Sequence, residues 1–350
     1  MLPGISPSRR SFLLGASSLG LAGLLLPNRP ALAQTGSLTI GNYGGDWHNR
    51  IQRIFEDDFS ARHSVRMSHE FGSGPQRRTK LLSERALPRG SMDVAWFTDQ
   101  EAFDVQQHDL LVDLDMSKIP NAEHIFPNLR SPFYMPWVIA SYGILYNPEL
   151  IDTPPTSYAD LWDPRFSGLV GINDMNYEQN IQIASLITTG DITSTEEAFA
   201  KLNEMKETQK PRFYANHEHL GAAFASGEIA IATNFTARGH QWNNDGISVT
   251  VAYPSEGMLV QSFGVAIPKK AQNPDLAYAY LNELLEPKVM AAMAAESFYV
   301  PAVDNADLPA ELDAQIGIPP EQTEKMHLVD YAKVGALKTE WLDRWNREIK

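Results

Sequence analysis

The chain contains no cysteine. Disulfides, thiolate zinc sites, iron–sulfur clusters, a cysteine nucleophile and a lipid anchor on an N-terminal cysteine are therefore excluded. The catalytic signatures G-x-S-x-G, H-E-x-x-H and G-x-x-x-x-G-K-[ST] are also missing. The paired acids at 57–58 and 196–197 would point apart on a helix, so they do not form a glycosidase pair. A secreted enzyme is therefore only a distant alternative, and we expect no enzymatic activity and no cofactor.

An apolar run long enough to cross a membrane is missing as well. Residues 13–26 form an uncharged run of about 14 residues, short of the roughly 20 that a bilayer requires. The run follows Arg9-Arg10 and precedes Ala31-Leu32-Ala33. This order is typical of a twin-arginine signal peptide, here over residues 1–33, although an amphipathic or buried N-terminal helix is the alternative. We expect cleavage near Ala33 and a mature protein in the periplasm.

Basic side chains are scarce relative to acidic ones. The chain has 29 Lys and Arg against 43 Asp and Glu, a formal charge of −14. Removing residues 1–33 takes away three arginines and no acid, which leaves 26 basic and 43 acidic side chains and a charge of −17. This sign disfavours nucleic acid and anionic membrane surfaces as partners, and it keeps an exported protein soluble.

Strand and helix patterns alternate at the start of the mature chain. Residues 37–43 alternate in polarity and end at Gly44-Gly45, which predicts a strand and a tight turn. Asp46 is placed to cap the helix that follows. Further strands are expected at 65–67 and 92–96, with a helix at 79–86 between them. The order β-α-β-α-β predicts a parallel sheet of the α/β class.

The alternation continues to the C-terminus. Strands are expected at 140–146, 168–172 and 228–233, and helices at 158–161, 196–206, 274–285, 287–295 and 338–349. The helix at 196–206 would turn Phe199, Leu202 and Met205 inward, and the last helix would bury a stripe of Trp341, Leu342, Trp345 and Ile349. Because the mature chain exceeds the usual size of a single core, we expect two lobes.

Four segments resemble one protein family. They are S-Y-G-I-L-Y-N at 141–147, Y-A-D-L-W-D-P-R-F-S-G at 158–168, F-A-S-G-E-I-A at 224–230 and F-G-V-A-I-P-K at 263–269. Their sequences and order are similar to those of periplasmic solute-binding proteins of ABC importers, nearest to the spermidine/putrescine type (extracellular solute-binding protein family 1). The resemblance runs from Leu38 to about Val303.

The resemblance implies an α/β, two-lobed periplasmic binding protein type II fold. Lobe 1 would comprise 34–137 and 262–320, lobe 2 would comprise 138–261, and 321–350 would be a C-terminal helical segment. A small-molecule solute would bind between hinge-connected lobes, and closure would present it to an inner-membrane ABC permease. The resemblance thus implies a monomer that docks transiently with its permease, with no metal and no nucleic acid.

Two strand ends carry aromatic candidates for solute contact. Ligands of α/β sheets lie at the carboxyl ends of strands, where turns expose backbone N–H groups. An ordinary strand–helix turn and packing within a lobe are the alternative interpretation of both segments. The candidates are Tyr43, Gly44, Gly45, Trp47, Trp96, Phe97 and Asp99.

A third strand end, after Ile172, carries acidic candidates. Polyamine receptors of the resembled type place two carboxylates here, which would pair with amines. Glu178 matches one of them, while the other falls on Met175 with Asp174 beside it. Tyr177 lies between the two acids. Alternatively, Asp174 is a helix cap and Glu178 is a solvated acid.

The chain departs from the polyamine receptors at three positions. Gln261 and Phe263 stand where those receptors carry a tryptophan and an aspartate, and Asn234 lies where a tryptophan stacks on the ligand. A polyamine needs several carboxylates, so a shorter solute with an amine at one end and an acid at the other fits better. Arg238 would clamp the acid, or else form a surface salt bridge. Phe298, next to Tyr299, would close one wall or pack within the lobe.

Two other solute classes remain open on the same fold. A ferric receptor would need clustered tyrosines, and the chain has no adjacent tyrosine pair. Its one histidine cluster, His217-Glu218-His219, is expected in a solvated loop. A dicarboxylate or a phosphonate is the second class, since Gly44-Gly45 opens a helix N-terminus.

Overall fold

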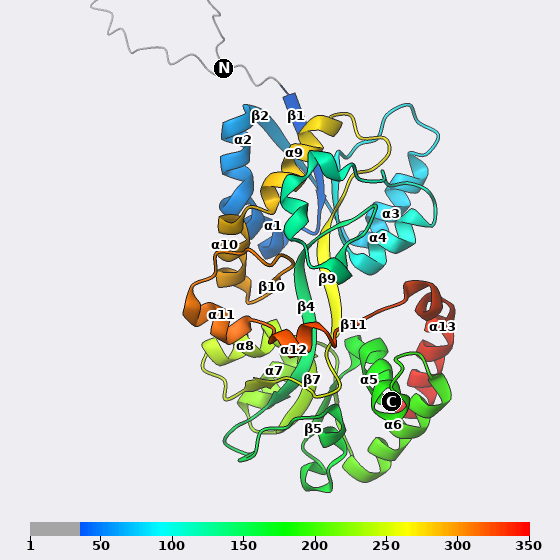
Figure 1. The fold of residues 1–350 in the computed structure, drawn as a ribbon. Helices are drawn as coiled ribbons and strands as arrows, with labels where there is room; N and C mark the ends of the chain where they lie inside the picture. The colour runs from blue at the N-terminus through cyan, green and yellow to red at the C-terminus, as the bar shows by residue number, and fades with distance from the viewer. Residues whose placement is uncertain (1–35) are drawn as a thin grey trace, which may run out of the picture. The chain divides into compact units, whose positions relative to one another are not determined.

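The computed structural model describes residues 36–350, without the side chains of residues 320 and 321 (Figure 1). The predicted signal peptide, residues 1–33, lies outside the described residues. Within residues 36–350, no helix combines the length and the apolar character that crossing a membrane requires.

One mixed sheet of 11 strands organises the fold. The strands are β1 (Gly36–Asn42), β2 (Val65–Phe71), β3 (Val94–Thr98), β4 (Met135–Tyr146), β5 (Val170–Asn173), β6 (Arg212–Tyr214), β7 (Ile231–Phe235), β8 (Thr250–Ala252), β9 (Leu259–Ala266), β10 (Val300–Pro301) and β11 (His327–Leu328). The main path has the order β2-β1-β3-β9-β4-β7-β5-β6. β1 is parallel to β2 and β3, which confirms the predicted parallel opening. The pairs β3–β9, β9–β4 and β4–β7 are antiparallel.

The strands β4 and β9 pair with each other, and they contribute to the two largest hydrophobic cores among the described residues. Trp137 of β4 and Val265 of β9 belong to the first core, whereas Tyr142 of β4 and Leu259 of β9 belong to the second. We call the elements around the first core the first half, and those around the second core the second half. Because β4 and β9 contribute residues to both cores, they connect the two halves.

The start of β4 was predicted wrongly. The sequence placed it near residue 140, but the strand begins at Met135 and all of its residues are buried. A strand buried on both faces has no polar alternation to mark its beginning. The strand predicted at 228–233 is β7, displaced by a few residues to 231–235.

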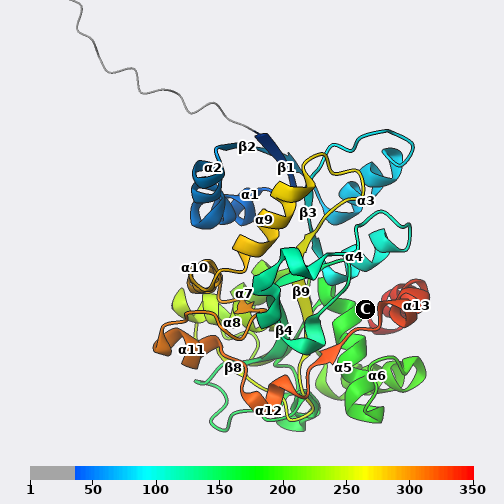
Figure 2. The same ribbon diagram turned by 45° about the horizontal axis from the view of Figure 1, so that its top comes forward.

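Six helices surround the strands of the first half (Figure 2). They are α1 (Gly45–Ile51), α2 (Asp57–His63), α3 (Gly74–Ser83), α4 (Asp99–Gln106), α9 (Pro274–Leu284) and α10 (Pro287–Ser297), and a π-helical segment η1 (Gln52–Glu56) joins α1 to α2. The helices predicted at 274–285 and 287–295 are confirmed as α9 and α10. α3 begins before the predicted residue 79, because the Ser73 hydroxyl accepts the Gln76 N–H in a capping box. Asp46 does not cap α1, whose N-cap is Gly44 without a side-chain hydrogen bond.

Four helices pack around the second half. They are α5 (Tyr177–Thr189), α6 (Thr195–Gln209), α7 (His217–Ala225) and α8 (Thr236–Asn244). The prediction of α6 is confirmed, with Phe199, Leu202 and Met205 buried. The expectation of a loop at residues 217–219 was wrong, because Asn216 caps α7 by accepting the His219 N–H at 2.9 Å. The helix predicted at 158–161 is the 3₁₀ turn Tyr158–Trp162.

The C-terminal segment returns to the second half. After α11 (Ala310–Ile316) and α12 (Pro320–Thr323), it contains α13 (Tyr331–Arg344) and a final π-helical turn, η8 (Trp345–Ile349). α13 lies beside α5 and η8 beside α6 (Figures 1 and 2). Trp341, Trp345 and Ile349 are buried in the second core, as predicted, but Leu342 is 45% exposed. The buried residues recur every fourth position, and Leu342 lies off that row.

Candidate functional site

The ends of β1 and β3 meet the middle of β9 at the junction of the two halves. β1 ends just before Tyr43, and β3 ends just before Asp99. β9 pairs with β3 so that Phe263 lies opposite Thr98. Candidates that are far apart in the sequence are therefore brought to one edge of the sheet, as expected for the carboxyl ends of strands in an α/β fold.

An aromatic cluster occupies this junction, consisting of Tyr43, Trp47, Phe263 and Tyr299. The ring centroid of Trp47 lies 5.4 Å from that of Phe263 and 6.2 Å from those of Tyr43 and Tyr299. The rings of Phe263 and Tyr299 are 5.8 Å apart. All four residues are partly exposed, so their rings can contact a bound molecule.

Fully buried rings support the cluster. Trp96 and Trp137 are 0% exposed and pack edge-on against Trp47, at 5.6 and 6.1 Å. Phe97 is also fully buried. The candidates Trp96 and Phe97 are thus covered in this structure, and they position their neighbours. Trp137 was not a candidate, because nothing in the sequence around β4 marks it as lying next to Trp47.

The hydroxyl of Tyr43 is held in place by its neighbours. It donates a hydrogen bond to Glu101 Oε2 at 2.7 Å, and the Arg77 guanidinium lies 4.3 Å from the ring centroid. Burial, with a further contribution from Glu101, raises the pKa of Tyr43 well above its usual value. Arg77 is 3% exposed, and its Nε and Nη2 have no hydrogen-bond partner among the described residues. Tyr43 is therefore a rigid, protonated part of the cluster.

Two glycines turn the chain from β1 into α1. Gly44 has φ 83° and Gly45 has φ 57°, conformations that other residues adopt with strain. A Cβ on Gly44 would also meet the Phe71 ring at 3.4 Å. This turn starts α1 at once, so Trp47 in its first turn reaches the centre of the aromatic cluster.

A hollow of about 430 Å³ opens beside Trp47. Residues of both halves line it, so a molecule bound there would touch both. Arg50, one of two arginines in the lining, already pairs with Glu296 at 3.5 Å. Asp46, Trp47, Phe298 and Tyr299 line it from the first half, and Arg238 and Gln241 line it from the second.

Arg238 is the second arginine, and it has no carboxylate partner among the described residues. Its Nη1 donates to Gln241 Oε1 at 3.2 Å. Its positive charge lowers the pKa of His217 in addition to the larger effect of burial. Burial raises the pKa of Tyr299, and the positive charge of Arg238 offsets part of that rise. The Arg238 guanidinium, which lines the hollow, therefore interacts electrostatically with a side chain of each half, His217 and Tyr299.

Contacts between α8 and the end of α10 close one side of the hollow. Gln241 Nε2 donates to the carbonyl of Ser297 at 3.0 Å, and the rings of His240 and Phe298 are 6.2 Å apart. Burial lowers the pKa of His240 from 6.5 to about 4, so this ring is neutral at pH 7. The predicted wall residue Phe298 thus packs against the second half while it lines the hollow.

The two acidic candidates are paired with lysines of the C-terminal segment. Glu178 Oε1 lies 3.2 Å from Lys338 Nζ. Asp174 forms an ion pair with Lys350 and accepts the Trp345 indole N–H at 2.8 Å. These contacts join residues more than 150 positions apart in sequence, so no local pattern predicts them.

Asp99 ties three elements together. Its carboxylate accepts the backbone N–H of Ser262 at 3.0 Å and the Tyr331 hydroxyl at 2.7 Å. Burial outweighs these hydrogen bonds and raises the pKa of Asp99 from 3.8 to about 6. Its contacts link α4 to β9 and to the start of α13.

We expect Asp99→Asn to remove a pH dependence of stability between about pH 4 and 6. In this window the native protein keeps a proton that the unfolded chain has lost, because burial raises the Asp99 pKa to about 6. The contribution of Asp99 to the free energy of unfolding therefore falls as the pH rises, by about 3 kcal/mol for a shift of roughly two units. Urea denaturation at several pH values measures the difference between the two proteins.

The exposed residue Asp245 offers a matched control for this experiment. Asp245→Asn should follow the wild-type pH profile throughout. Equal slopes for the wild type and Asp99→Asn between pH 4 and 6 would contradict the raised pKa of Asp99. The comparison is made against the wild type at each pH, so the titration of other groups cancels.

Three further candidates lie in the second half or on β9. Asn234 is 0% exposed and accepts the Phe235 N–H at 2.9 Å, while its Nδ2 has no partner among the described residues. Tyr177 lies 6.3 Å from the Trp345 ring. Gln261 lines a narrow hollow of about 20 Å³ together with Glu178. None of these three lines the hollow beside Trp47.

A larger hollow of about 560 Å³ lies elsewhere in the first half. All of its lining residues fall within 116–136, a single stretch of chain. It touches neither the aromatic cluster nor the second half. We therefore place the candidate site at the smaller hollow, which both halves line.

Comparison with known families gives a match over most of the chain. Residues 56–320 match the family model described as bacterial extracellular solute-binding protein. The spermidine/putrescine-binding periplasmic protein of Escherichia coli K12 is 26% identical over 194 residues, which cover 53% of this chain and 56% of the relative. The match thus spans about half the length of the relative.

Solved structures of the same architecture cover nearly the whole described chain. A putative extracellular solute-binding protein from Bordetella parapertussis superposes with a TM-score of 0.80 at 20% identity, covering 90% of this chain and 99% of that one. A spermidine/putrescine ABC transporter substrate-binding protein from Streptococcus pneumoniae gives 0.75 at 22% identity, covering 90% and 100%. At this level of identity, the likeness concerns the fold.

Proposed function

This chain belongs to the bacterial extracellular solute-binding proteins, and from that premise we propose that it captures a small organic solute between its halves for an ABC permease. The family and the two-lobed α/β fold of type II periplasmic binding proteins, both predicted from the sequence, are confirmed. The observation that carries the proposal is the hollow of about 430 Å³, which aromatic rings of the first half and Arg238 of the second half line together.

We propose that the two halves are lobes that close on the solute. Lobe 1 comprises residues 34–137 and 262–320, and lobe 2 comprises 138–261. Two separate cores and the two long strands that pass between them support this division. Solute contacts to both lobes favour the closed state, which is the state that a permease would recognise. The segment 321–350 then belongs with lobe 2, against which α13 packs.

The lining of the hollow suits a short solute that carries a carboxylate and an amine. Among the described residues, the Arg238 guanidinium has Gln241 as its hydrogen-bond partner, and such a fork binds carboxylates in two-pronged fashion. Trp47, Tyr299 and Phe298 line the hollow and offer aromatic faces for an ammonium group and an apolar stem. We therefore favour an amino acid of γ-amino type over a longer amine.

A polyamine is the second candidate function. The E. coli relative is named for spermidine and putrescine, and Glu178 and Asp174 are the acids that an amine would need. Both acids are already paired, with Lys338 and Lys350. A polyamine would have to displace these lysines from the carboxylates, and the displacement costs part of its binding energy.

We further propose that the mature protein works in the periplasm after twin-arginine export, as a monomer that turns nothing over. The predicted signal over residues 1–33 and the periplasmic relative support this location. The acidic charge excludes no small solute, but it disfavours nucleic acid. Thermal-shift measurements with amines, amino acids and dicarboxylates, together with product analysis, test both binding and the absence of turnover.

Glu178→Gln distinguishes the two candidate solutes. If the solute binds at Arg238, the affinity for γ-aminobutyrate should change by less than about twofold, because the lost group faces Lys338. If an amine binds at Glu178, the affinity for putrescine should fall by about 10- to 150-fold, the loss of a hydrogen bond to a charged group. Calorimetric titration measures both affinities. Glu149→Gln, at an exposed acid of the same half, is the control.

A further inference from the structure

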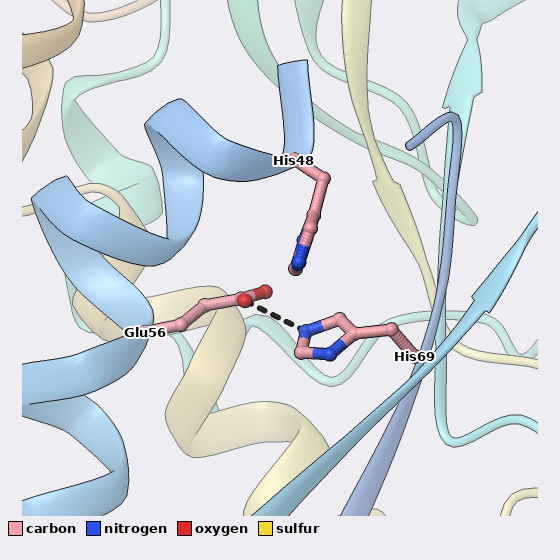
Figure 3. Close-up of side chains that lie close together, drawn as sticks. All are labelled: His48, Glu56 and His69. Atoms are coloured by element: carbon pink, nitrogen blue, oxygen red, sulfur yellow. Dashed lines mark hydrogen bonds and ion pairs between the residues drawn. The ribbon is translucent and has the colours of Figure 1, made fainter. Parts of the chain in front are cut away.

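Two histidines and a glutamate converge in the first half, away from the hollow beside Trp47. His48 lies on α1, Glu56 ends the π-helical segment η1, and His69 lies on β2 (Figure 3). One ligand atom of each lies within 4.8 Å of those of the other two. The sequence does not predict this cluster, because the spacing between residues 48, 56 and 69 matches no common metal-binding motif.

The hydrogen bonds of the three side chains leave one buried nitrogen, on His48, without a partner among the described residues. His69 Nε2 lies 2.7 Å from Glu56 Oε2, and the Tyr280 hydroxyl donates to Glu56 Oε1 at 2.8 Å. Glu56 is 1% exposed, and His69 is its one ion-pair partner among residues 36–350. His48 is 9% exposed, and its Nδ1 is buried without a hydrogen-bond partner among those residues. A buried imidazole nitrogen without a partner is costly unless something binds it, and His48 Nδ1 is such an atom.

The donor set is the one that zinc uses with an open position. Two imidazoles and one carboxylate bind Zn²⁺ at about 2.0–2.2 Å and leave a fourth site for water. Tetrahedral ligand atoms around such an ion lie about 3.4 Å apart, so the most distant pair here must approach by at most about 1.4 Å. Rotation of the side chains supplies a movement of this size, since the rings of His48 and His69 are already 4.3 Å apart.

The surroundings provide an entry path and a second shell. A hollow of about 300 Å³ reaches Glu56 and His69, and Gln52 and Asp57 also line it. Tyr280 holds the second carboxylate oxygen, as outer-shell partners of metal ligands do. The glutamate ends a π-helical segment, a feature that recurs at functional sites.

From this geometry we propose that His48, Glu56 and His69 bind one Zn²⁺ ion, with water from the adjoining hollow as the fourth ligand. The ion would replace the direct His69–Glu56 contact and occupy the free nitrogen of His48. It would also tie α1 to β2. Because His48 directly follows Trp47, the ion would fix the helix that carries the centre of the aromatic cluster. The proposal does not depend on the solute, because zinc binding is measured without one.

The test uses the mature chain from Gln34, purified without a histidine tag and stripped with EDTA. Titration with ZnCl₂ should give one ion per chain and a rise in melting temperature, whereas MgCl₂ should give neither. His48→Gln and His69→Gln should each weaken zinc binding by about 100-fold or more, because losing a ligand exceeds the 10- to 100-fold cost of losing an outer-shell partner. Tyr280→Phe, which leaves all three ligands, should weaken it by about tenfold.

His63→Gln is the matched control, since His63 bonds to Glu283 and lies outside the cluster. It should bind zinc as the wild type does. Wild-type binding that both cluster variants retain unchanged, or no binding by the wild type, would overturn the proposal. Should the variants fail to fold, X-ray absorption of the zinc-loaded wild type decides. A spectrum that shows two imidazole nitrogens and a carboxylate oxygen about 2.0–2.2 Å from the zinc supports the site, and a spectrum without imidazole ligands contradicts it.

Discussion

Arg238→Gln is expected to weaken binding of a carboxylate-bearing solute by about 10- to 150-fold. The guanidinium lines the hollow, and among the described residues it has no carboxylate partner of its own. Hydrogen bonds to a charged group contribute about 1.5–3 kcal/mol, and 1.4 kcal/mol is a factor of ten in affinity. Glutamine keeps a polar side chain of similar shape but removes the charge. Calorimetric titration with γ-aminobutyrate measures the loss.

Two further variants separate the charge from its geometry. Arg238→Lys should recover part of the affinity, because an ammonium keeps the charge but cannot bind a carboxylate through two parallel hydrogen bonds. Arg165→Gln, at an exposed arginine that pairs with Asp163, should leave binding unchanged. If Arg238→Gln binds γ-aminobutyrate as tightly as the wild type, Arg238 does not hold the solute.

Trp345→Ala is expected to destabilise the protein by about 3–5 kcal/mol. Trp345 is 1% exposed in the second core and donates its indole N–H to Asp174 at 2.8 Å. Truncating a buried tryptophan leaves a cavity and lost packing of this size. The variant also leaves the Asp174 carboxylate with Lys350 as its remaining partner. Urea denaturation followed by fluorescence and by circular dichroism gives the free energy of unfolding.

Leu342→Ala tests whether burial sets the effect. Leu342 lies on α13, which continues directly into the turn η8 that carries Trp345, but it is 45% exposed, so its truncation should change stability by no more than about 0.5 kcal/mol. If the two variants lose the same stability, the C-terminal helix is not packed on the second core as described. If the unfolding curves measured by fluorescence and by circular dichroism coincide, α13 and the second core unfold together.

Much of the fold was predictable because its signals are local. α6, α9 and α10 show helical periodicity, and the last two begin with a proline that fixes their first turn. The parallel opening followed from the alternation of strands and helices. β4 was predicted too short, because a strand buried throughout resembles any apolar run.

The candidate site was predicted less completely, because its geometry depends on distant contacts. Tyr43 and Trp47 follow a strand end and a glycine pair, which are visible in the sequence, and both lie in the aromatic cluster. That Lys338 would pair with Glu178 is not visible, since the two residues are joined only by the packing of α13 on α5. His48, Glu56 and His69 likewise come together only once β2 has returned beside β1.

The central claim is that a small solute binds in the hollow between the halves, held by rings and Arg238. Calorimetric titration of the mature protein with γ-aminobutyrate, succinate, putrescine and spermidine tests it most directly. The proposal predicts saturable binding of one γ-aminobutyrate per chain, lost in Arg238→Gln and kept in Glu178→Gln. Binding of putrescine or spermidine alone, lost in Glu178→Gln and kept in Arg238→Gln, would contradict it.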